Sequence, residues 1–300
     1  MFRFPVLVAG CLQTISRARS EPACPWDNGI VRVRGVLFDM DGVIYNDDVP
    51  IAGAAEAVRW AVSHGVPHLF VTNTTSKGRK ALVEKLRRMG IETGPSHILT
   101  PCVAASEWLR TEPPGPVALF VRRVAREEFQ DLPLVKEGAE TGAAYVVIGD
   151  LGPEWDFKTL NRAFRLLHHQ PDARLIALGM TRYWQTAEGV SLDVAPFVAA
   201  LEHATGRQPQ VFGKPAEAFF RAAAQQLGLA RNEIVMIGDD IDTDIGGAQA
   251  AGLRCALVQT GKFRAADLEG PVRPDAVLAS VASLPEWWRT AGAGLVNSAF

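Results

Sequence analysis

The segment that most constrains the fold of this chain is an apolar run that stops at two carboxylates. Residues 35–42 read GVLFDMDG, so Asp39 and Asp41 close a run of Val, Leu and Phe. A run of this kind predicts a strand that is buried on both faces of a parallel sheet. Both carboxylates then lie at the C-terminal end of the strand, where open α/β sheets bind their ligands. An acidic turn formed for purely local reasons is the alternative.

Two further segments end in groups that can bind phosphate. Residues 68–71 predict a strand followed by Thr72 and Asn73, whose hydroxyl and amide can hold phosphate oxygens without adding charge. Lys214 stands between a glycine and a proline just before a helical segment. Its backbone is therefore restrained, and the side chain can serve as a fixed cation. Ordinary turn residues and a solvated lysine are the corresponding alternatives.

A third segment combines a predicted buried strand with a dense acidic cluster. Residues 234–238 are apolar, and the next six residues contain four carboxylates, at Asp239, Asp240, Asp242 and Asp244. Mutual repulsion makes such a cluster costly unless a hard cation neutralises it, and ligands that are all oxygen suit Mg²⁺. Together with the preceding segments, the cluster completes a set of groups that indicates phosphoryl transfer.

In order and spacing, these segments resemble the motifs of the haloacid dehalogenase superfamily, over residues 34–284. The interval between Asn73 and Lys214 is long enough for the inserted cap domain of subclass IIA, which includes the NagD-like nucleotidases and pyridoxal phosphate phosphatase. A closer similarity, to the phospholysine phosphohistidine inorganic pyrophosphate phosphatase family and its hydrolase-domain relatives, rests on residues 178–184, 192–197 and 260–264.

The pattern of predicted elements agrees with the fold that this resemblance implies. Strand and helix signals alternate from residue 31 onward, as in a doubly wound parallel sheet. The resemblance implies an α/β fold with a Rossmann-like core and an inserted α/β cap. A linker rich in proline at 112–116 and a return hinge at 206–209 predict the bounds, with the core over 31–111 and 208–300 and the cap over 112–207. Residues 1–30 have no regular period and are expected to form a loosely ordered extension.

The resemblance implies a phosphatase that hydrolyses phosphate esters, pyrophosphate or N-phosphoryl compounds through an aspartyl-phosphate intermediate. It assigns Asp39 as the nucleophile, and Asp41 as the group that protonates the leaving atom and later activates water. Thr72, Asn73 and Lys214 are implied to bind the phosphate oxygens. A phosphotransferase or mutase that uses the same intermediate, and a non-catalytic phosphate-binding protein, are the alternatives.

The resemblance also implies that Mg²⁺ is the cofactor. Asp39, the carbonyl of Asp41, and Asp239 are expected to hold the ion, with waters and a phosphate oxygen completing an octahedron. Asp244 and Asp240 would orient this shell of ligands.

Residues of the expected cap that could select substrates follow a strand predicted over 175–178. They are Arg182, Tyr183 and Trp184, a cation and two aromatic rings. These side chains could contact the substrate or pack the cap against the core, and the sequence leaves both interpretations open. Asp150 follows another predicted strand, and we expect it to form a turn because no nucleophile or cation is adjacent to it in sequence.

Composition narrows the class of protein. With 300 residues and 48% apolar residues, the chain can bury a large core, and its net charge of -2 gives no basic surface for nucleic acid. Its apolar runs are too short to span a bilayer. The four cysteines have no zinc-like spacing, which favours reduced thiols in the cytoplasm. The expected partners are a small phosphorylated substrate and, through the cap, a second copy of the chain.

Overall fold

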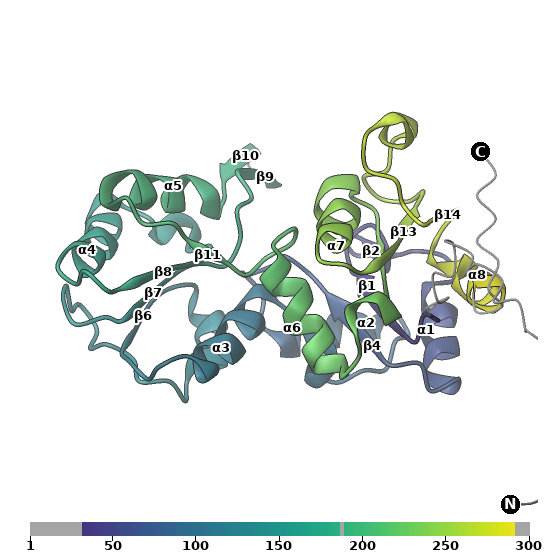
Figure 1. The fold of residues 1–300 in the computed structure, drawn as a ribbon, viewed down its shortest axis with the longest axis horizontal. Helices are drawn as coiled ribbons and strands as arrows, with labels where there is room; N and C mark the ends of the chain where they lie inside the picture. The colour runs from purple at the N-terminus through teal and green to yellow at the C-terminus, as the bar shows by residue number, and fades with distance from the viewer. Residues whose placement is uncertain (1–31, 187–188, 292–300) are drawn as a thin grey trace, which may run out of the picture. The chain divides into compact units, whose positions relative to one another are not determined.

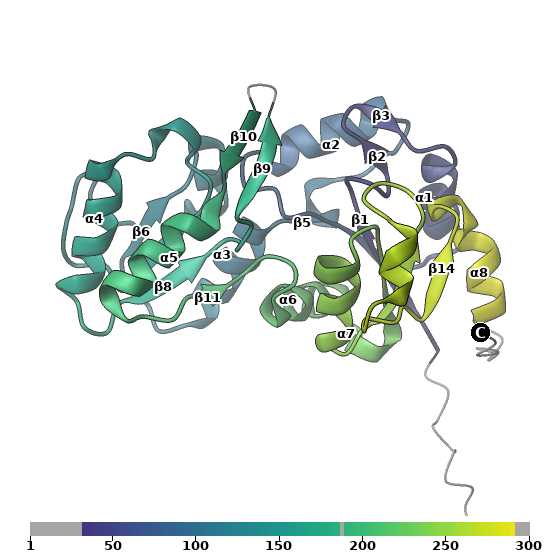
Figure 2. The ribbon, with the colours of Figure 1, turned by 90° about the horizontal axis from the view of Figure 1, so that it is seen from above.

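The computed structural model describes residues 32–186 and 189–291. The expected N-terminal extension therefore lies outside the described residues. The main sheet of the protein has six strands in the order β14-β13-β12-β1-β4-β5, all paired in parallel (Figures 1 and 2). The strands are β1 (Gly35–Asp39), β4 (His68–Val71), β5 (Ile98–Leu99), β12 (Ile234–Gly238), β13 (Arg254–Val258) and β14 (Ala276–Leu278).

Helices cover both faces of this sheet, which confirms the predicted doubly wound core. Val36 and Phe38 of β1 belong to the hydrophobic cluster of one face, whereas Leu37 belongs to the cluster of the other, as the strand period requires. The first face carries α1 (Ala54–Ser63), α2 (Arg79–Arg88) and α8 (Leu284–Ala291). The second carries α3 (Pro101–Thr111), α6 (Glu217–Leu227) and α7 (Gly247–Ala250).

The order of the strands reverses beside β1, and this reversal fixes where a ligand can bind. From β1 the chain proceeds to β4 and β5 on one side, and later to β12, β13 and β14 on the other side. Such a switch point opens a crevice beyond the carboxyl ends of the strands. Asp39 ends β1 and Asp239 follows β12, so both stand at this crevice.

A second parallel sheet has the order β11-β8-β7-β6. Its strands are β6 (Val117–Phe120), β7 (Tyr145–Ile148), β8 (Arg174–Ala177) and β11 (Gln210–Val211). One face packs against α4 (Phe157–His168) and α5 (Val194–Thr205), and the other shares a hydrophobic cluster with α3. We call residues 117–211 the cap, and the described residues on either side of it the core.

Pairing of β11 with β8 keeps the chain in the second sheet beyond residue 207, where we expected it to return to the core. The sequence signal was a Gly-to-Pro segment at 206–209, but two further residues complete a parallel edge strand before the chain leaves. We therefore propose that the inserted domain extends to Val211.

Two short hairpins were not predicted, because neither has a clear alternation of apolar and polar residues. The first, β2 (Tyr45–Asn46) and β3 (Val49–Pro50), follows the carboxylates at the end of β1. The second, β9 (Tyr183–Thr186) and β10 (Gly189–Leu192), belongs to the cap. Short 3-10 helices link other elements: η1 (Pro95–His97), η2 (Arg123–Phe129), η3 (Gly152–Glu154), η4 (Arg231–Glu233), η6 (Ala265–Glu269) and η7 (Val281–Ser283).

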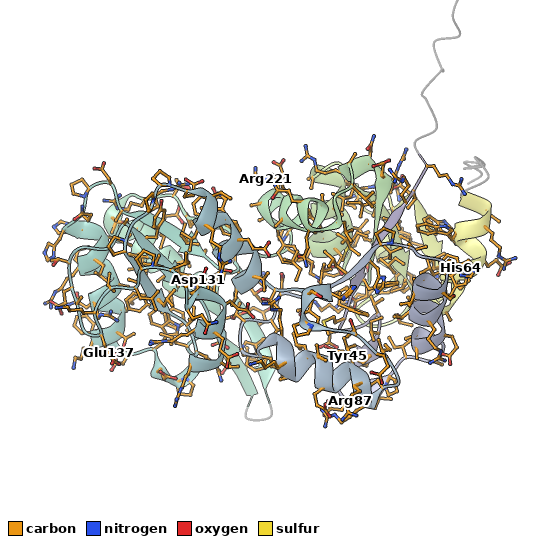
Figure 3. All side chains as sticks on the ribbon, turned by 90° about the horizontal axis from the view of Figure 1, so that it is seen from below. Tyr45, His64, Arg87, Asp131, Glu137 and Arg221 are labelled. Atoms are coloured by element: carbon orange, nitrogen blue, oxygen red, sulfur yellow. The ribbon has the colours of Figure 1, made fainter. Side chains whose placement is uncertain are left out.

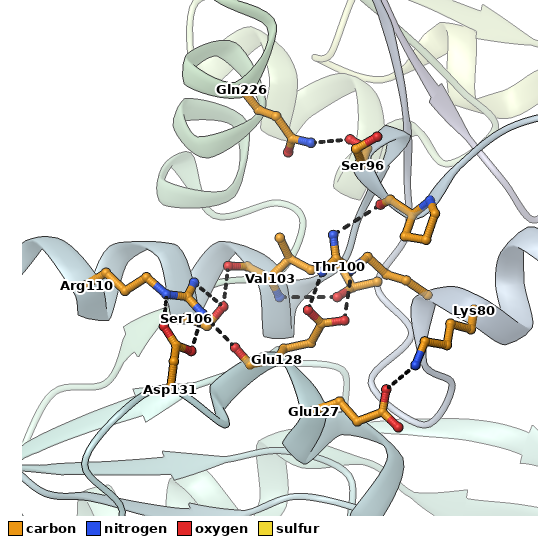
Figure 4. A network of polar contacts seen from close by, with 12 residues as sticks. Lys80, Ser96, Thr100, Val103, Ser106, Arg110, Glu127, Glu128, Asp131 and Gln226 are labelled. Carbon is orange, nitrogen blue, oxygen red and sulfur yellow. Dashed lines mark hydrogen bonds and ion pairs between the residues drawn. The ribbon is translucent and has the colours of Figure 1, made fainter.

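Charged side chains connect the core to η2 of the cap and to Asp131, two residues beyond it (Figure 4). Arg79, at the start of α2, donates two hydrogen bonds of 2.8 and 2.6 Å to the carboxylate of Glu128. Arg110, at the end of α3, makes the same kind of bidentate pair with Asp131, at 2.8 and 2.7 Å. Bidentate arginine–carboxylate pairs of this kind are stronger and more directional than single hydrogen bonds.

Within the described residues, no helix is long and apolar enough to cross a membrane.

Candidate active site

Three buried carboxylates meet at the crevice beside β1. Asp39, Asp239 and Asp244 each offer an oxygen, and these oxygens lie within 4.8 Å of one another. The three residues are 7%, 1% and 0% exposed, respectively. Buried like charges at this spacing raise one another's pKa or require a cation, and oxygen ligands suit a hard divalent ion.

Lys214 supplies one positive charge to this cluster. Its Nζ lies 2.6 Å from Asp39 Oδ1 and 2.7 Å from Asp244 Oδ1, and the side chain is buried. Burial alone would lower the pKa of Lys214, but the charges of Asp244 and Asp39 raise it above its ordinary value. Lys214 therefore remains a cation, and it neutralises only part of the negative charge.

Burial and the excess negative charge raise the pKa values of two of these carboxyls. Burial and the nearby charge of Asp244 raise the pKa of Asp39 to about 8, against the opposing effect of Lys214. Burial raises the pKa of Asp239 to about 6, although a backbone hydrogen bond from Lys262 opposes the shift. The protein groups alone thus leave Asp39 holding a proton near neutral pH, and Asp239 holding one only at lower pH, and a bound divalent cation would favour the ionised form of both.

One oxygen atom tests whether the residues present fit a metal ion. Asp239 Oδ2 accepts a hydrogen bond of 2.7 Å from the backbone N–H of Lys262. Asp239 Oδ1 is buried and has no hydrogen-bond partner among the described residues. A buried oxygen without a partner is costly, and a cation bound to it would remove that cost. The cluster therefore fits a metal site.

The two other acids of the expected metal shell have different surroundings. Asp244 belongs to the cluster: its Oδ2 accepts from the backbone N–H groups of Asp239 and Asp240, each at 3.2 Å. Asp240 instead starts the π-helical turn η5 (Ile241–Gly246), where its Oδ1 accepts from two backbone N–H groups. Its Oδ2 is 3.1 Å from Lys262 Nζ. The structure thus brings Asp244 into contact with Lys214, whereas Asp240 is occupied by its own turn.

The second carboxylate of the first motif stays outside the buried cluster. Asp41 is exposed, and it lines the cleft in front of the cluster. The backbone turns sharply after it, because Gly42 has φ 84° and donates its N–H to the carbonyl of Tyr45 at 2.7 Å. Tyr45, on the first hairpin, is labelled in Figure 3. Asp41 thus reaches solvent while Asp39 does not.

Asn73 has a role that the sequence did not reveal. Its Oδ1 accepts from the backbone N–H of Lys214 at 2.7 Å, and its Nδ2 donates to the carbonyl of Lys214 at 2.9 Å. Both ends of the amide thus hold the backbone of the lysine that pairs with Asp39. Thr72 Oγ1 accepts a hydrogen bond of 3.2 Å from Thr74 N–H, which leaves its own hydroxyl hydrogen to donate.

A cleft of about 600 Å³ lies between the core and the cap, with Asp41 and Asp240 on its core side. Its core side includes the cations Lys77, Lys85 and Lys262. Its cap side is formed by Asp150, Thr181, Trp184 and Asp193. Burial raises the pKa of Asp193, with Asp150 adding to the shift.

Of the three residues expected to select substrates, only Trp184 lines this cleft. Alternation along β9 turns the neighbouring Tyr183 away, and its side chain is 57% exposed. The Arg182 guanidinium lies 6.0 Å from the centre of the Tyr183 ring. Asp150 forms the expected turn, since its Oδ1 accepts from Gly152 N–H at 2.6 Å, yet it also reaches the cleft.

Comparison with known proteins identifies the class. Residues 36–134 match the haloacid dehalogenase-like hydrolase family, and residues 211–284 match a second family described as HAD-hydrolase-like. The chain is 37% identical over 251 residues to human phospholysine phosphohistidine inorganic pyrophosphate phosphatase, covering 82% of this chain and 90% of that protein. It is 38% identical over 243 residues to bovine haloacid dehalogenase-like hydrolase domain-containing protein 2, covering 81% and 90%.

Solved structures agree. The p-nitrophenyl phosphatase from Archaeoglobus fulgidus superimposes with a TM-score of 0.77 at 29% identity, over 85% of this chain and 99% of that one. NagD from E. coli K-12 gives a TM-score of 0.76 at 25% identity, over 84% and 98%. The chain therefore belongs to the haloacid dehalogenase-like hydrolases. Within that family it is a phosphatase of subclass IIA, similar to the phospholysine phosphohistidine inorganic pyrophosphate phosphatases.

Proposed function

We propose that this phosphatase uses Mg²⁺ and an aspartyl-phosphate intermediate, with N-phosphoryl compounds as its preferred substrates. The distribution of charged residues in the cleft is the observation that supports this choice of substrate. A phosphoryl group would lie on the core side, against Lys214 and the cluster, while the leaving group would lie under Trp184 and Asp193. An aromatic face beside carboxylates suits a cationic amine. A second phosphate, as in pyrophosphate, would instead meet the Asp193 carboxylate on this side of the cleft, where Asp150 is already paired with Arg122 at 3.2 Å.

In the proposed first step, the Asp39 carboxylate attacks phosphorus and the bond to the leaving group breaks. Lys214, which lies 2.6 Å from Asp39, would pair with the phosphoryl oxygens as negative charge builds on them. The Thr72 hydroxyl and the backbone N–H of Asn73 would donate further hydrogen bonds. The Asn73 side chain would act indirectly, because its amide holds the Lys214 backbone.

Asp41 would protonate the leaving nitrogen or oxygen in the first step and take a proton from water in the second. The support for this role is the exposed position of Asp41 at the cleft, two residues after the buried Asp39. Water can reach Asp41 there, which favours hydrolysis over transfer to another acceptor.

Asp39, Asp239 and the carbonyl of Asp41 would hold Mg²⁺, and Asp244 would stay with Lys214 at the edge of the shell. Bound there, the ion supplies positive charge to the phosphoryl oxygens and keeps the carboxylates ionised. The observations behind this proposal are the all-oxygen donor set and the unpartnered Asp239 Oδ1.

The test is a substrate panel with purified protein and Mg²⁺. We expect kcat/KM to be higher for phospholysine or another amine-bearing phosphoramidate than for pyrophosphate, with p-nitrophenyl phosphate as a neutral reference. Hydrolysis of pyrophosphate with the highest kcat/KM would overturn the assignment of the leaving group. An inactive wild type against all of these substrates would overturn the proposed reaction.

We also infer that two copies associate through the cap. Tyr183 and Leu192 are opposite each other in the β9–β10 hairpin, and with Val190 they expose apolar surface, at 57%, 63% and 67%. Light scattering of wild type and Leu192→Asp tests this: a dimer that the substitution converts to monomer is expected.

We place the protein in the cytoplasm. The support is that Cys102 and Cys255 are buried free thiols, which suits a reducing compartment. The other two cysteines lie outside the described residues.

A further inference from the structure

A loop that follows β13 crosses over the turn that follows β1. Thr260 Oγ1 donates a hydrogen bond of 2.5 Å to the carbonyl of Gly42. Two residues later, the backbone N–H of Lys262 donates to Asp239 Oδ2 at 2.7 Å. The loop therefore binds both the backbone beside Asp41 and the carboxylate of Asp239.

The contact to Asp239 distinguishes the two oxygens of that carboxylate. Oδ2 is taken by the Lys262 N–H, whereas Oδ1 is buried without a partner among the described residues. A carboxylate that could rotate freely would present either oxygen to a cation. With one oxygen held by the loop, Oδ1 is the oxygen left for a metal ion.

Space at this crossing admits only glycine. A Cβ atom built on Gly261 would lie 2.1 Å from Asp239 Oδ2 and 2.5 Å from the Cα atom of Gly42. Gly261 also has φ 64°, in the left-handed region that favours glycine. Gly42 is equally close, since its own Cβ would lie 2.0 Å from Asp239 Oδ2. The loop, the first turn and the carboxylate are thus in direct contact.

The side chain of Lys262 is separate from this contact. Its Nζ pairs with Asp240 at 3.1 Å, and the side chain is 71% exposed. A surface ion pair of this kind contributes little. The contact to Asp239 Oδ2 is thus made by the backbone N–H of Lys262 and not by its side chain.

We propose that residues 260–262 are a positioning element for the metal site, which sets the Asp239 carboxylate and the Gly42 backbone through Thr260 Oγ1, the close approach of Gly261 and the Lys262 N–H. This inference rests on the proposed metal dependence. Groups that orient metal ligands in this way typically change metal affinity by about 10–100-fold when they are altered.

The experiment measures the affinity of the purified full-length protein for Mg²⁺ and Mn²⁺ by calorimetry, with the Tm in EDTA as an independent measure of folding. Gly261→Ala should lower the affinity for both ions by at least about tenfold. Thr260→Val should lower this affinity severalfold, and Thr260→Ser, which keeps the hydroxyl, should have the wild-type affinity. Arg264→Met alters an exposed side chain two residues beyond the element and should bind both ions as the wild type does.

Wild-type metal affinity in both Gly261→Ala and Thr260→Val would overturn the positioning role while leaving the proposed function intact. Equal losses in Thr260→Val and Thr260→Ser would also overturn it. If Gly261→Ala does not fold, the valine and serine pair decides. A wild type that binds neither ion would overturn both this inference and the proposed metal dependence.

Discussion

The acidic cluster is built differently from the cap wall, the side of the cleft formed by Asp150, Thr181, Trp184 and Asp193. In the cluster, Asp39, Asp239, Asp244 and Lys214 are at most 7% exposed, and contacts from several strands hold them. On the cap wall, Trp184 is 44% exposed on a two-stranded hairpin. Altering a buried ion pair by removing one partner costs about 3–5 kcal/mol, whereas most surface changes stay within about 0.5 kcal/mol. The groups that we propose to react are therefore constrained by the fold, whereas those that we propose to select the substrate are less constrained.

The largest expected effect comes from the nucleophile. Asp39→Asn should reduce kcat by at least about 10³-fold, a barrier increase of about 4 kcal/mol, because an amide does not attack phosphorus. Stability should fall less than for a buried pair that loses its only partner, because Lys214 keeps Asp244 at 2.7 Å and the raised pKa of Asp39 means that its charge is unfavourable in the metal-free protein. The matched control is Asp242→Asn, an exposed member of the same acidic run. Its kcat should match the wild type, and an active Asp39→Asn would refute the assignment.

Removal of the metal should have the next largest effect, and it should depend on pH. The pKa values of Asp39 and Asp239 rise from 3.8 to about 8 and about 6. A raised carboxyl pKa stabilises the folded state at low pH, and this stability is lost as pH rises toward the folded value. EDTA should therefore abolish turnover, and the gain in Tm on adding Mg²⁺ should be greater at pH 8 than at pH 6. A gain independent of pH would place the ion elsewhere.

Replacing the buried Lys214 should affect both catalysis and stability, and the two effects can be measured separately. Lys214→Met should lower kcat/KM by about 10²-fold or more, through loss of a charge at the phosphoryl group. It should also destabilise the metal-free protein by about 3–5 kcal/mol, because Asp39 and Asp244 lose their cation. Urea unfolding measures the second effect. Arg221→Met, on the exposed side of α6, is the control that should leave both quantities unchanged.

Cap substitutions should have smaller and selective effects. Trp184→Ala and Asp193→Asn should each raise KM for an amine-bearing phosphoramidate by about 3–10-fold, which corresponds to about 1 kcal/mol of cation recognition. Their effect on p-nitrophenyl phosphate should stay within about twofold. Equal losses on both substrates would mean that these side chains support packing and not recognition.

Arg182→Ala should change least. Arg182 does not line the cleft, so the KM and kcat of the Arg182→Ala variant should stay within about twofold of wild type for every substrate. A larger effect limited to one substrate would show that the cap wall extends beyond Trp184.

Much of the core could be predicted because its signals are local. Each buried strand is a short apolar run, and the acids at the ends of β1 and β12 stand directly beside those runs. The contacts of Asn73 and Thr260 could not be predicted in this way. Asn73 binds a backbone 141 positions away, and Thr260 binds one 218 positions away. Such pairings depend on which strands become neighbours, which no local pattern reports.

The position of β12 next to β1 has a consequence for biosynthesis. As the chain leaves the ribosome, the cap sheet can close once Val211 has emerged, whereas β1 still lacks the neighbour that β12 will supply. The nascent core thus waits with an unpaired hydrophobic edge, the kind of surface that chaperones cover. Lys262 must also emerge before Asp239 is held. The order of the chain therefore allows the cap sheet to pair before the acidic cluster can be completed.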